Sequence, residues 1–376
     1  MRAVVVYPGQ SRPPEIAQIP EPALTAGTAR VETLRVGVCG TDREILAGGH
    51  GQPPPGRDRL VLGHESFGRV LEIAPGAPGD LRPGDLVVAT VRRPCNHCRE
   101  CAEGMSDFCL SGDFVERGIL GMDGFLSERY VEDPAYLIRV PAELAAVGVL
   151  LEPLSVVEKA LQQAYAAQAR IPGRPTAELD PWRIGAGSWR VLRALVLGAG
   201  PIGMLAALLL RLLGAREVVV VERTARPTKA ALLQTAGAGY VATAGAPLRE
   251  ALGSDPFDLV LEATGSGRAV VDALPLLAAN GVACLTGIFA AGEPPEPVAI
   301  NDLLREMVYR NKAIVTSVNS NRSYFERGVE SMGALEARWP GLLAGLISRR
   351  MPFERYAEAV QPERDGVKTV IEVAAG

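Results

Sequence analysis

Residues 193–203, RALVLGAGPIG, decide the fold that this sequence predicts. An apolar run ends in the pattern Gly-x-Gly-x-x-Gly, and the apolar residues 204–213 that follow have the composition of a helix. The first glycine permits a tight turn, the second lets the backbone approach a pyrophosphate, and the third allows close helix–strand packing. The helix start presents unpaired N–H groups and the positive end of its dipole to phosphates. We therefore expect a bound dinucleotide, rather than a turn of purely structural purpose, with contacts from Gly198, Gly200, Pro201, Ile202 and Gly203.

The end of the next apolar run, EVVVVE, bears on which dinucleotide binds. Glu222 stands where a carboxylate can accept hydrogen bonds from both adenine-ribose hydroxyls. It would repel a 2′-phosphate, which favours NAD, but Arg223 and Arg226 follow and either could pair with that phosphate. Both arginines could equally be solvated loop residues. We predict NAD, with NADP use left open, and assign Thr264, at the end of FDLVLEAT, as a further cofactor contact.

Strand-like and helix-like stretches alternate from residue 191 onward. Alternating units with apolar strands predict an α/β fold, in which a parallel, doubly wound sheet is covered on both faces. We place this Rossmann domain at residues 187–314.

The N-terminal part, roughly the first 150 residues, instead shows short β-type runs such as RAVVV and DLVVATV between Pro/Gly turn signals. This pattern predicts an all-β, barrel-like domain. Residues 158–169 are helix-forming, residues 171–190 form a Pro/Gly-rich connection, and a last strand at 368–373 could rejoin the first domain. We predict a β-rich domain at 1–186, completed by 315–376.

Composition excludes several classes of function. The chain has 376 residues, which suits two domains, and its net charge of −4 argues against nucleic acid or an anionic membrane as the main partner. The start, MRAVVVYPGQ, lacks the pattern of a signal peptide, and no apolar stretch is long enough to cross a bilayer. With cysteines expected to be reduced, these features predict a cytoplasmic protein.

Four cysteines follow the spacing C-x2-C-x2-C-x7-C, namely Cys95, Cys98, Cys101 and Cys109. Such spacing lets thiolates converge on a tetrahedral zinc, whereas disulfides between cysteines two residues apart would be strained. We predict a closed, structural zinc site.

A second, more dispersed set of residues could hold a catalytic zinc. Cys39, His64 with its neighbour Glu65, and Glu152 mix sulfur, nitrogen and oxygen donors, as open zinc sites do. Spacing alone does not show that they converge, and a histidine beside a glutamate is commonly a satisfied structural pair. Both interpretations stay open at this point.

The combination of CGTD, GHESFGRVLEIAP, RPGDLV, the cysteine lobe and GAGPIG resembles the zinc-dependent medium-chain alcohol dehydrogenases over essentially the whole chain. That resemblance implies a GroES-like β domain with the catalytic zinc, a Rossmann domain with NAD(P), and substrate in the cleft between them. Narrower motifs are most similar to the archaeal-type glucose dehydrogenases, among them CGTDREI (39–45), the arginine pair 92–93, GDF-x-E-x-GI (112–119) and EPLSVVEKA (152–160).

The narrower resemblance implies roles for individual residues. Cys39, His64 and Glu65 would lie around the zinc, and whether Glu65 or Glu152 binds the metal would depend on substrate. Glu116 and Asn319 would hold sugar hydroxyls, the alternative being solvated polar residues. Val156 stands where some relatives carry an acidic residue, which puts glucose itself in question more than the reaction class.

The implied reaction is oxidation of the anomeric hydroxyl of an aldose to the aldonolactone, with hydride transfer to NAD(P). Thr41 would pass the hydroxyl proton towards solvent, and each chain would hold one catalytic and one structural zinc. The alternatives are a dehydrogenase of another polyol, secondary alcohol or amino alcohol, and a non-catalytic NADPH-binding relative.

The resemblance also implies a homotetramer, a dimer of dimers, with a dimer as the second possibility. Residues 314–318, IVTSV, are the candidate edge strand for pairing between subunits, although a buried internal strand fits the same sequence.

Overall fold

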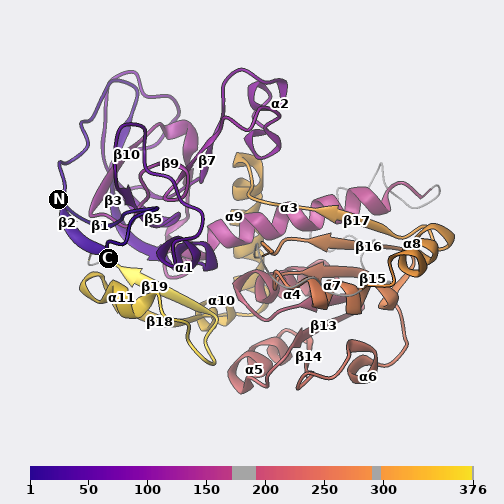
Figure 1. Cartoon of the computed structure of the whole chain (residues 1–376). Helices are drawn as coiled ribbons and strands as arrows, with labels where there is room; N and C mark the ends of the chain where they lie inside the picture. Colours follow the sequence, from indigo (N-terminus) through magenta and orange to yellow (C-terminus); the bar gives the residue numbers. More distant parts are fainter. Residues whose placement is uncertain (172–191, 290–297, 375–376) are drawn as a thin grey trace. The chain divides into compact units, whose positions relative to one another are not determined.

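Residues 193–203 form the strand, turn and helix that their sequence predicts. Strand β12 (Arg193–Leu197) leads through Gly198, whose φ is +97°, into helix α4 (Pro201–Leu212). In the computed structural model, which describes residues 1–171, 192–289 and 298–374, β12 lies inside a six-stranded, all-parallel sheet (Figure 1). The sheet order is β14-β13-β12-β15-β16-β17, and the other strands are Glu217–Glu222 (β13), Gly239–Ala242 (β14), Phe257–Glu262 (β15), Leu277–Leu285 (β16) and Ala313–Thr316 (β17).

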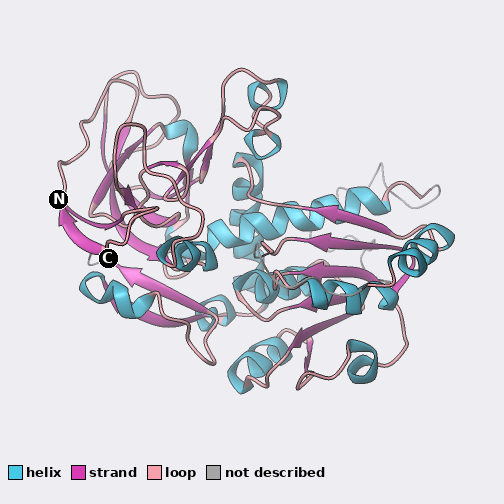
Figure 2. Ribbon diagram, in the orientation of Figure 1, coloured by secondary structure: helices cyan, strands magenta, loops and turns pink. Residues whose placement is uncertain are grey.

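The strand order reverses between β12 and β15, which is the doubly wound arrangement of a dinucleotide-binding sheet. Its central strands are almost wholly apolar because helices flank the sheet (Figure 2). Besides α4, these helices are α5 (Pro227–Thr235), α6 (Leu248–Leu252), α7 (Gly267–Ala273) and α8 (Ile300–Tyr309). The predicted fold class is confirmed.

Strand β17 is at the edge of this sheet, paired only with β16 among the described strands. Ile314 is 40% exposed, and residue 318 lies beyond the strand. A buried internal strand is therefore ruled out for β17, whereas its pairing between subunits stays a prediction.

The N-terminal residues form three sheets, one of which includes the C-terminal strands β18 and β19. The largest has the order β11-β6-β5-β3-β19-β18, with β10 also paired to β3, and the core beneath it contains Val31, Val70, Phe125 and Ile371. Its strands are Ala29–Gly37 (β3), Glu65–Ile73 (β5), Leu86–Ala89 (β6), Arg129–Glu132 (β10), Leu137–Arg139 (β11), Ile347–Pro352 (β18) and Lys368–Glu372 (β19). The prediction that the last strand rejoins the first domain is therefore confirmed.

The N-terminal part also contains two three-stranded sheets, and the remaining described α-helices are distributed over both ends of the chain and its middle. The sheets contain Arg2–Val6 (β1), Glu15–Gln18 (β2) and Leu60–Val61 (β4), and Arg92–Arg93 (β7), Val115–Arg117 (β8) and Gly121–Met122 (β9). The helices are Gly40–Leu46 (α1), Arg99–Ala102 (α2), Leu151–Gln168 (α3), Arg322–Arg338 (α9), Leu342–Leu346 (α10) and Tyr356–Ala359 (α11).

Helix α3 begins at Leu151, seven residues before the helix-forming stretch predicted at 158–169. Glu152 therefore lies in the first turn of α3. Pro153 does not prevent this, because a proline is tolerated in the first turn, where its missing N–H has no helical partner.

The chain divides into two compact units. The first unit contains Met1–Ser155, Asn319–Met332 and Ile347–Gly376, and the second contains Val156–Val318 and Gly333–Leu346. The predicted boundary at 186/187 and most of the predicted connection 171–190 lie outside the described residues. Among the described helices, none combines the length and apolarity needed to cross a membrane.

Candidate metal and cofactor sites

Cys39, His64 and Glu65 converge in the first unit. Cys39 lies between the end of β3 and the start of α1, and the other two stand at the start of β5. Their candidate ligand atoms all lie within 4.8 Å of one another. Gly37 faces Glu65 across the β3–β5 pair, and a Cβ at position 37 would lie 2.0 Å from Glu65 Oε2. A glycine is therefore required there for the carboxylate to turn towards the cluster.

Asp42 holds this cluster in place from the first turn of α1. Its Oδ1 lies 3.3 Å from Nδ1 of His64, and its Oδ2 accepts a hydrogen bond of 2.8 Å from the Cys39 N–H. Burial lowers the pKa of His64, but the Asp42 carboxylate opposes burial so strongly that this pKa stands well above its ordinary value. With Nδ1 directed to Asp42, Nε2 of His64 is left for a metal, as is usual for histidine ligands.

A buried lysine reaches the same cluster from β19. Lys368 forms an ion pair with Glu65, donates a 3.0 Å hydrogen bond to the carbonyl oxygen of Val38, and is 1% exposed. Burial lowers the pKa of Lys368, but the charge of Glu65 more than offsets this, and the net shift is upward. Glu65 therefore has a positive partner in the protein, with which a metal ion would compete.

Glu152 is buried next to this cluster but is not one of its three converging residues. Burial, and then the charge of Glu65, raises the pKa of Glu152 to about 7. Thr41, the predicted proton acceptor, lies in the first turn of α1 beside Asp42 and is partly buried. One thiolate, one imidazole and a choice of two carboxylates make a donor set that fits a catalytic zinc.

The four lobe cysteines also converge. Their sulfurs lie within 4.8 Å of one another, and the Cys98 and Cys109 sulfurs are 4.0 Å apart, against about 3.8 Å for two thiolates on a tetrahedral zinc. Hydrogen bonds from the Ser111 hydroxyl and then the His97 backbone lower the pKa of Cys95 to about 5, which favours the thiolate. All six cysteines are free thiols, so the disulfide alternative has no support here.

Glu116 and Asn319 meet although 203 residues separate them. Glu116 Oε1 accepts hydrogen bonds from the Asn319 side-chain amide at 2.6 Å and from Arg92 Nε at 3.0 Å. Arg92 packs on Phe114, with its guanidinium 3.7 Å from the ring centroid. Glu116 is 9% exposed, so it is not a solvated surface residue, and Asn319 is partly buried.

The glycine turn of the second unit has the shape that a pyrophosphate needs. A Cβ at position 203 would lie 1.8 Å from the Gly198 carbonyl oxygen, so only glycine fits where α4 packs on the turn. A Cβ at position 200 would meet no atom within 4 Å, which leaves open space beside the start of α4. This arrangement fits a dinucleotide phosphate at the N-terminal end of α4.

Thr264 lies at the end of β15, where Glu262 fixes the backbone. The Glu262 carboxylate is fully buried and accepts hydrogen bonds from the Thr264 hydroxyl at 2.6 Å and from the Gly265 N–H at 2.8 Å. It also accepts one from the Gly287 N–H at 3.2 Å, and so joins the loops after β15 and β16. Thr264 packs against the fingerprint, with its Cγ2 2.7 Å from the position of a Cβ on Gly198.

Glu222 ends β13 as predicted, but its carboxylate is already engaged. Oε1 accepts a hydrogen bond of 2.8 Å from Lys229 Nζ, and Oε2 accepts one of 3.0 Å from the Tyr240 hydroxyl. Arg223 is exposed and Arg226 is partly buried.

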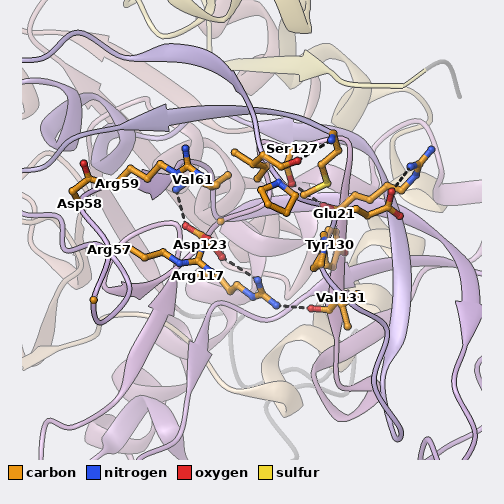
Figure 3. A pocket seen from close by; sticks show the side chains of 17 residues that line it. Glu21, Arg57, Asp58, Arg59, Val61, Arg117, Asp123, Ser127, Tyr130 and Val131 are labelled. Carbon is orange, nitrogen blue, oxygen red and sulfur yellow. Dashed lines mark hydrogen bonds and ion pairs between the residues drawn. The ribbon is translucent and has the colours of Figure 1, made fainter.

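A cavity of about 800 Å³ in the first unit is separate from these residues (Figure 3). Arg57, Arg59, Arg117 and Arg129 line it together with acidic residues. Asp123 pairs with Arg57 at 2.7 Å, and Glu21 pairs with Arg129 at 2.9 Å. No candidate metal ligand or sugar contact is among the residues that line it.

Several of these contacts were not predicted from the sequence. Asp42 had a signal, since it lies three residues after Cys39, where an acidic residue caps a helix. Lys229 also had one, as a lysine in the first turn after the strand that Glu222 ends. The sequence gives no sign of the buried contacts of Lys368 and Glu262, because a lysine or glutamate at a strand end is ordinarily solvated.

Known proteins are similar to this chain over essentially its whole length. The family described as the alcohol dehydrogenase GroES-like domain matches residues 25–142, and the family described as the glucose dehydrogenase C-terminus matches residues 145–373. Glucose 1-dehydrogenase of Methanocella arvoryzae is 40% identical, and glucose 1-dehydrogenase 1 of Caldivirga maquilingensis is 39% identical. The alignment covers 100% of both chains in the first case and 99% of both in the second.

A solved structure is similar over its full length. Haloferax mediterranei glucose dehydrogenase, in complex with NADP, Zn and gluconolactone, superposes with a TM-score of 0.86 at 33% identity and covers 100% of both chains. The resemblance inferred from the motifs is thereby confirmed. The chain belongs to the zinc-dependent medium-chain alcohol dehydrogenase superfamily and, within it, to the glucose dehydrogenase family.

Proposed function

We propose that this protein is a zinc-dependent, NAD(P)-dependent glucose 1-dehydrogenase. It oxidises the anomeric hydroxyl of an aldose, D-glucose first and D-galactose or D-xylose as further substrates, to the aldonolactone. The observation that carries this proposal is the convergence of Cys39, His64 and Glu65, in a chain whose full-length relatives are named for that activity. The bound NADP, zinc and gluconolactone of the Haloferax enzyme support it.

When bound, zinc would lower the pKa of the substrate hydroxyl and the nicotinamide would accept the C1 hydride. The residues of the chain bind and orient the metal and the substrate. Cys39, His64 and one of Glu65 or Glu152 hold the metal, and Asp42 fixes the His64 ring. The Thr41 hydroxyl takes the proton from the substrate hydroxyl and passes it towards solvent. The Glu116 carboxylate accepts hydrogen bonds from the sugar hydroxyls, and the Asn319 side-chain amide donates hydrogen bonds to them.

The remaining assignments belong to the same proposal. The four lobe cysteines hold a second, structural zinc, and Gly198, Gly200, Pro201, Ile202, Gly203, Glu222, Arg223 and Thr264 contact NAD(P). The predicted domains, residues 1–186 with 315–376 and residues 187–314, stay part of the proposal, the assembly is a homotetramer, and the six free thiols agree with a cytoplasmic protein.

Initial rates with a panel of alcohols test the proposal. NAD and NADP reduction is followed with D-glucose, D-galactose, D-xylose, sorbitol, L-threonine and 2-butanol, with and without a zinc chelator. We expect the aldoses to react and the chelator to stop them. A reaction confined to a non-sugar alcohol would keep the zinc chemistry and contradict the roles of Glu116 and Asn319.

Variants of the metal ligands test the catalytic centre separately. We expect Cys39→Ser and His64→Ala each to lower kcat/KM by about 10³-fold or more, since the metal supplies most of the charge stabilisation. Circular dichroism should show both variants folded. Normal turnover in either variant would contradict the assignment of the zinc site.

A further inference from the structure

The ion pair at the end of β13 changes what Glu222 can discriminate. A free carboxylate at this place attracts the ribose 2′-hydroxyl of NAD and repels the 2′-phosphate of NADP. Here Lys229 Nζ lies 2.8 Å from Oε1 of Glu222, and Lys229 is only 6% exposed. At this separation and burial, the lysine cancels most of the field of the carboxylate.

The hydrogen bonds leave Glu222 able to accept more. Each carboxylate oxygen has two lone-pair sites, and Lys229 and Tyr240 occupy one site on each. A ribose hydroxyl can therefore still bind to this carboxylate. Tyr240 is held by a second hydrogen bond, of 3.1 Å, from its hydroxyl to the Thr224 carbonyl oxygen, so its position does not depend on Glu222 alone.

The surrounding charge is positive once Glu222 and Lys229 cancel. The loop between β13 and α5 carries Arg223, which is exposed, and Arg226, whose buried Nε has no hydrogen-bond partner among the described residues. Two guanidinium groups beside a neutralised carboxylate suit a phosphate dianion.

We propose that Lys229 is a specificity-determining residue that, by pairing with Glu222, lets the adenosine end of the site accept a 2′-phosphate as well as a 2′-hydroxyl. This inference rests on the proposed function only in taking the second unit to bind NAD or NADP. It names the residue that sets the balance between the two cofactors at a site whose sequence alone favours NAD.

Binding of two truncated cofactors to the full, zinc-loaded protein tests the inference without turnover. ADP-ribose and 2′-phospho-ADP-ribose differ only at the 2′ position, and isothermal titration calorimetry gives a Kd for each. We expect the two wild-type Kd values to agree within about tenfold. In Lys229→Met the Kd of the 2′-phosphate ligand should rise about tenfold or more, while that of ADP-ribose changes less than about threefold.

Removal of the Glu222 charge gives a second test with the same two ligands. Glu222→Gln should tighten 2′-phospho-ADP-ribose and weaken ADP-ribose, each by about threefold or more, and the double variant Glu222→Gln/Lys229→Met should return the 2′-phosphate ligand to within about threefold of wild type. Lys229→Arg should keep the wild-type ratio. If Lys229→Met does not fold, the Lys229→Gln variant carries the same expectation.

Lys312 offers a matched control. It is also a buried lysine paired with a glutamate, Glu306 at 2.6 Å, but it precedes β17 at the opposite edge of the sheet from β14. Lys312→Met should leave the ratio of the two Kd values unchanged. If Lys229→Met weakens the affinity for both ligands equally, or for neither, the proposed role of Lys229 is overturned and the proposed function stands. If the wild-type protein binds neither ligand, both the role of Lys229 and the proposed function are overturned.

Discussion

At the scale of single residues, the metal cluster depends on contacts between buried charges. Asp42 contacts His64 and the Cys39 N–H at once, so its carboxylate sets the orientation of two ligands. We expect Asp42→Asn to lower zinc affinity about 10–100-fold, the usual effect of removing such a partner. Competition with a chromophoric chelator measures this. Asp123→Asn, which changes an aspartate paired with Arg57, should leave zinc affinity unchanged, and equal losses in both variants would contradict the specific role of Asp42.

In the zinc-free protein, Glu152 makes the free energy of unfolding depend on pH, and the direction of its pKa shift gives the sign of this dependence. Its pKa is raised from an ordinary 4.5 to about 7, by burial and then by Glu65, so between these values the folded state holds a proton that the unfolded state has lost. Raising the pH through this window therefore lowers the free energy of unfolding.

Thermal unfolding in the presence of a chelator, from about pH 5 to 8, checks this sign. Each kcal/mol lost should lower Tm by about 2–4 °C. In Glu152→Gln the fall should be smaller, because the residue no longer titrates. Superimposable pH profiles for the two proteins would show that Glu152 does not contribute.

The sequence predicted the candidate ligands of the metal cluster but not the buried lysine that pairs with one of them. Cys39, His64 and Glu65 were candidates because few side chains bind zinc, the resemblance to the alcohol dehydrogenases selected them, and the structure brings them together. Lys368 could not be foreseen, since it pairs with Glu65 across 303 residues of sequence, and no local pattern carries such a contact.

At the scale of elements, the cysteine lobe is connected to the predicted sugar contacts. The side-chain amide of Asn321 donates to Asp107 in the lobe at 2.9 Å, and Arg92 of β7 joins the Asp107 carbonyl oxygen to Glu116 of β8. The order of the lobe therefore affects the residues around Glu116.

We expect Cys98→Ser to remove about one zinc per chain, to lower Tm, and to raise KM for glucose several-fold, since structural zinc sites contribute directly to folding. Metal analysis and steady-state kinetics measure these effects. Cys284→Ser, at a buried cysteine of β16 outside the lobe, should retain both zinc ions. Full zinc content in Cys98→Ser would show that the lobe binds no metal.

Elements were predictable where local chemistry is strong. The glycine turn, the apolar parallel strands and the returning strand at 368–373 all follow from periodicity and turn residues. The start of α3 was missed because the prediction used only the helix-forming residues 158–169, whereas the helix begins at Leu151 and its first turn accepts Pro153.

At the scale of the whole molecule, an exposed apolar surface in the second unit supports self-association. On α8, Ile300, Leu304 and Val308 are spaced at helical intervals and are 52%, 50% and 76% exposed, and one edge of β17 pairs with no described strand. Proteins rarely leave such a surface uncovered.

We expect Val308→Glu to shift the proposed tetramer towards smaller species, because a buried unpaired charge weakens an interface by several kcal/mol. Light scattering after size-exclusion chromatography measures the mass. Leu110→Glu, at a residue 71% exposed in the cysteine lobe, is the control and should leave the mass unchanged. A tetramer that survives the Val308 substitution would place the interface elsewhere.

Because β19 lies near the end of the sequence, it determines the order in which the two sheets can form during synthesis. All six strands of the second unit's sheet leave the ribosome before Lys368 does, so that sheet can form while the larger sheet of the first unit still lacks β19. At about 5–20 residues per second, the part of β3 that β19 later covers stays open for roughly 15–60 s. Throughout translation of the second unit, the ligand cysteine and histidine are therefore present without the lysine that balances Glu65.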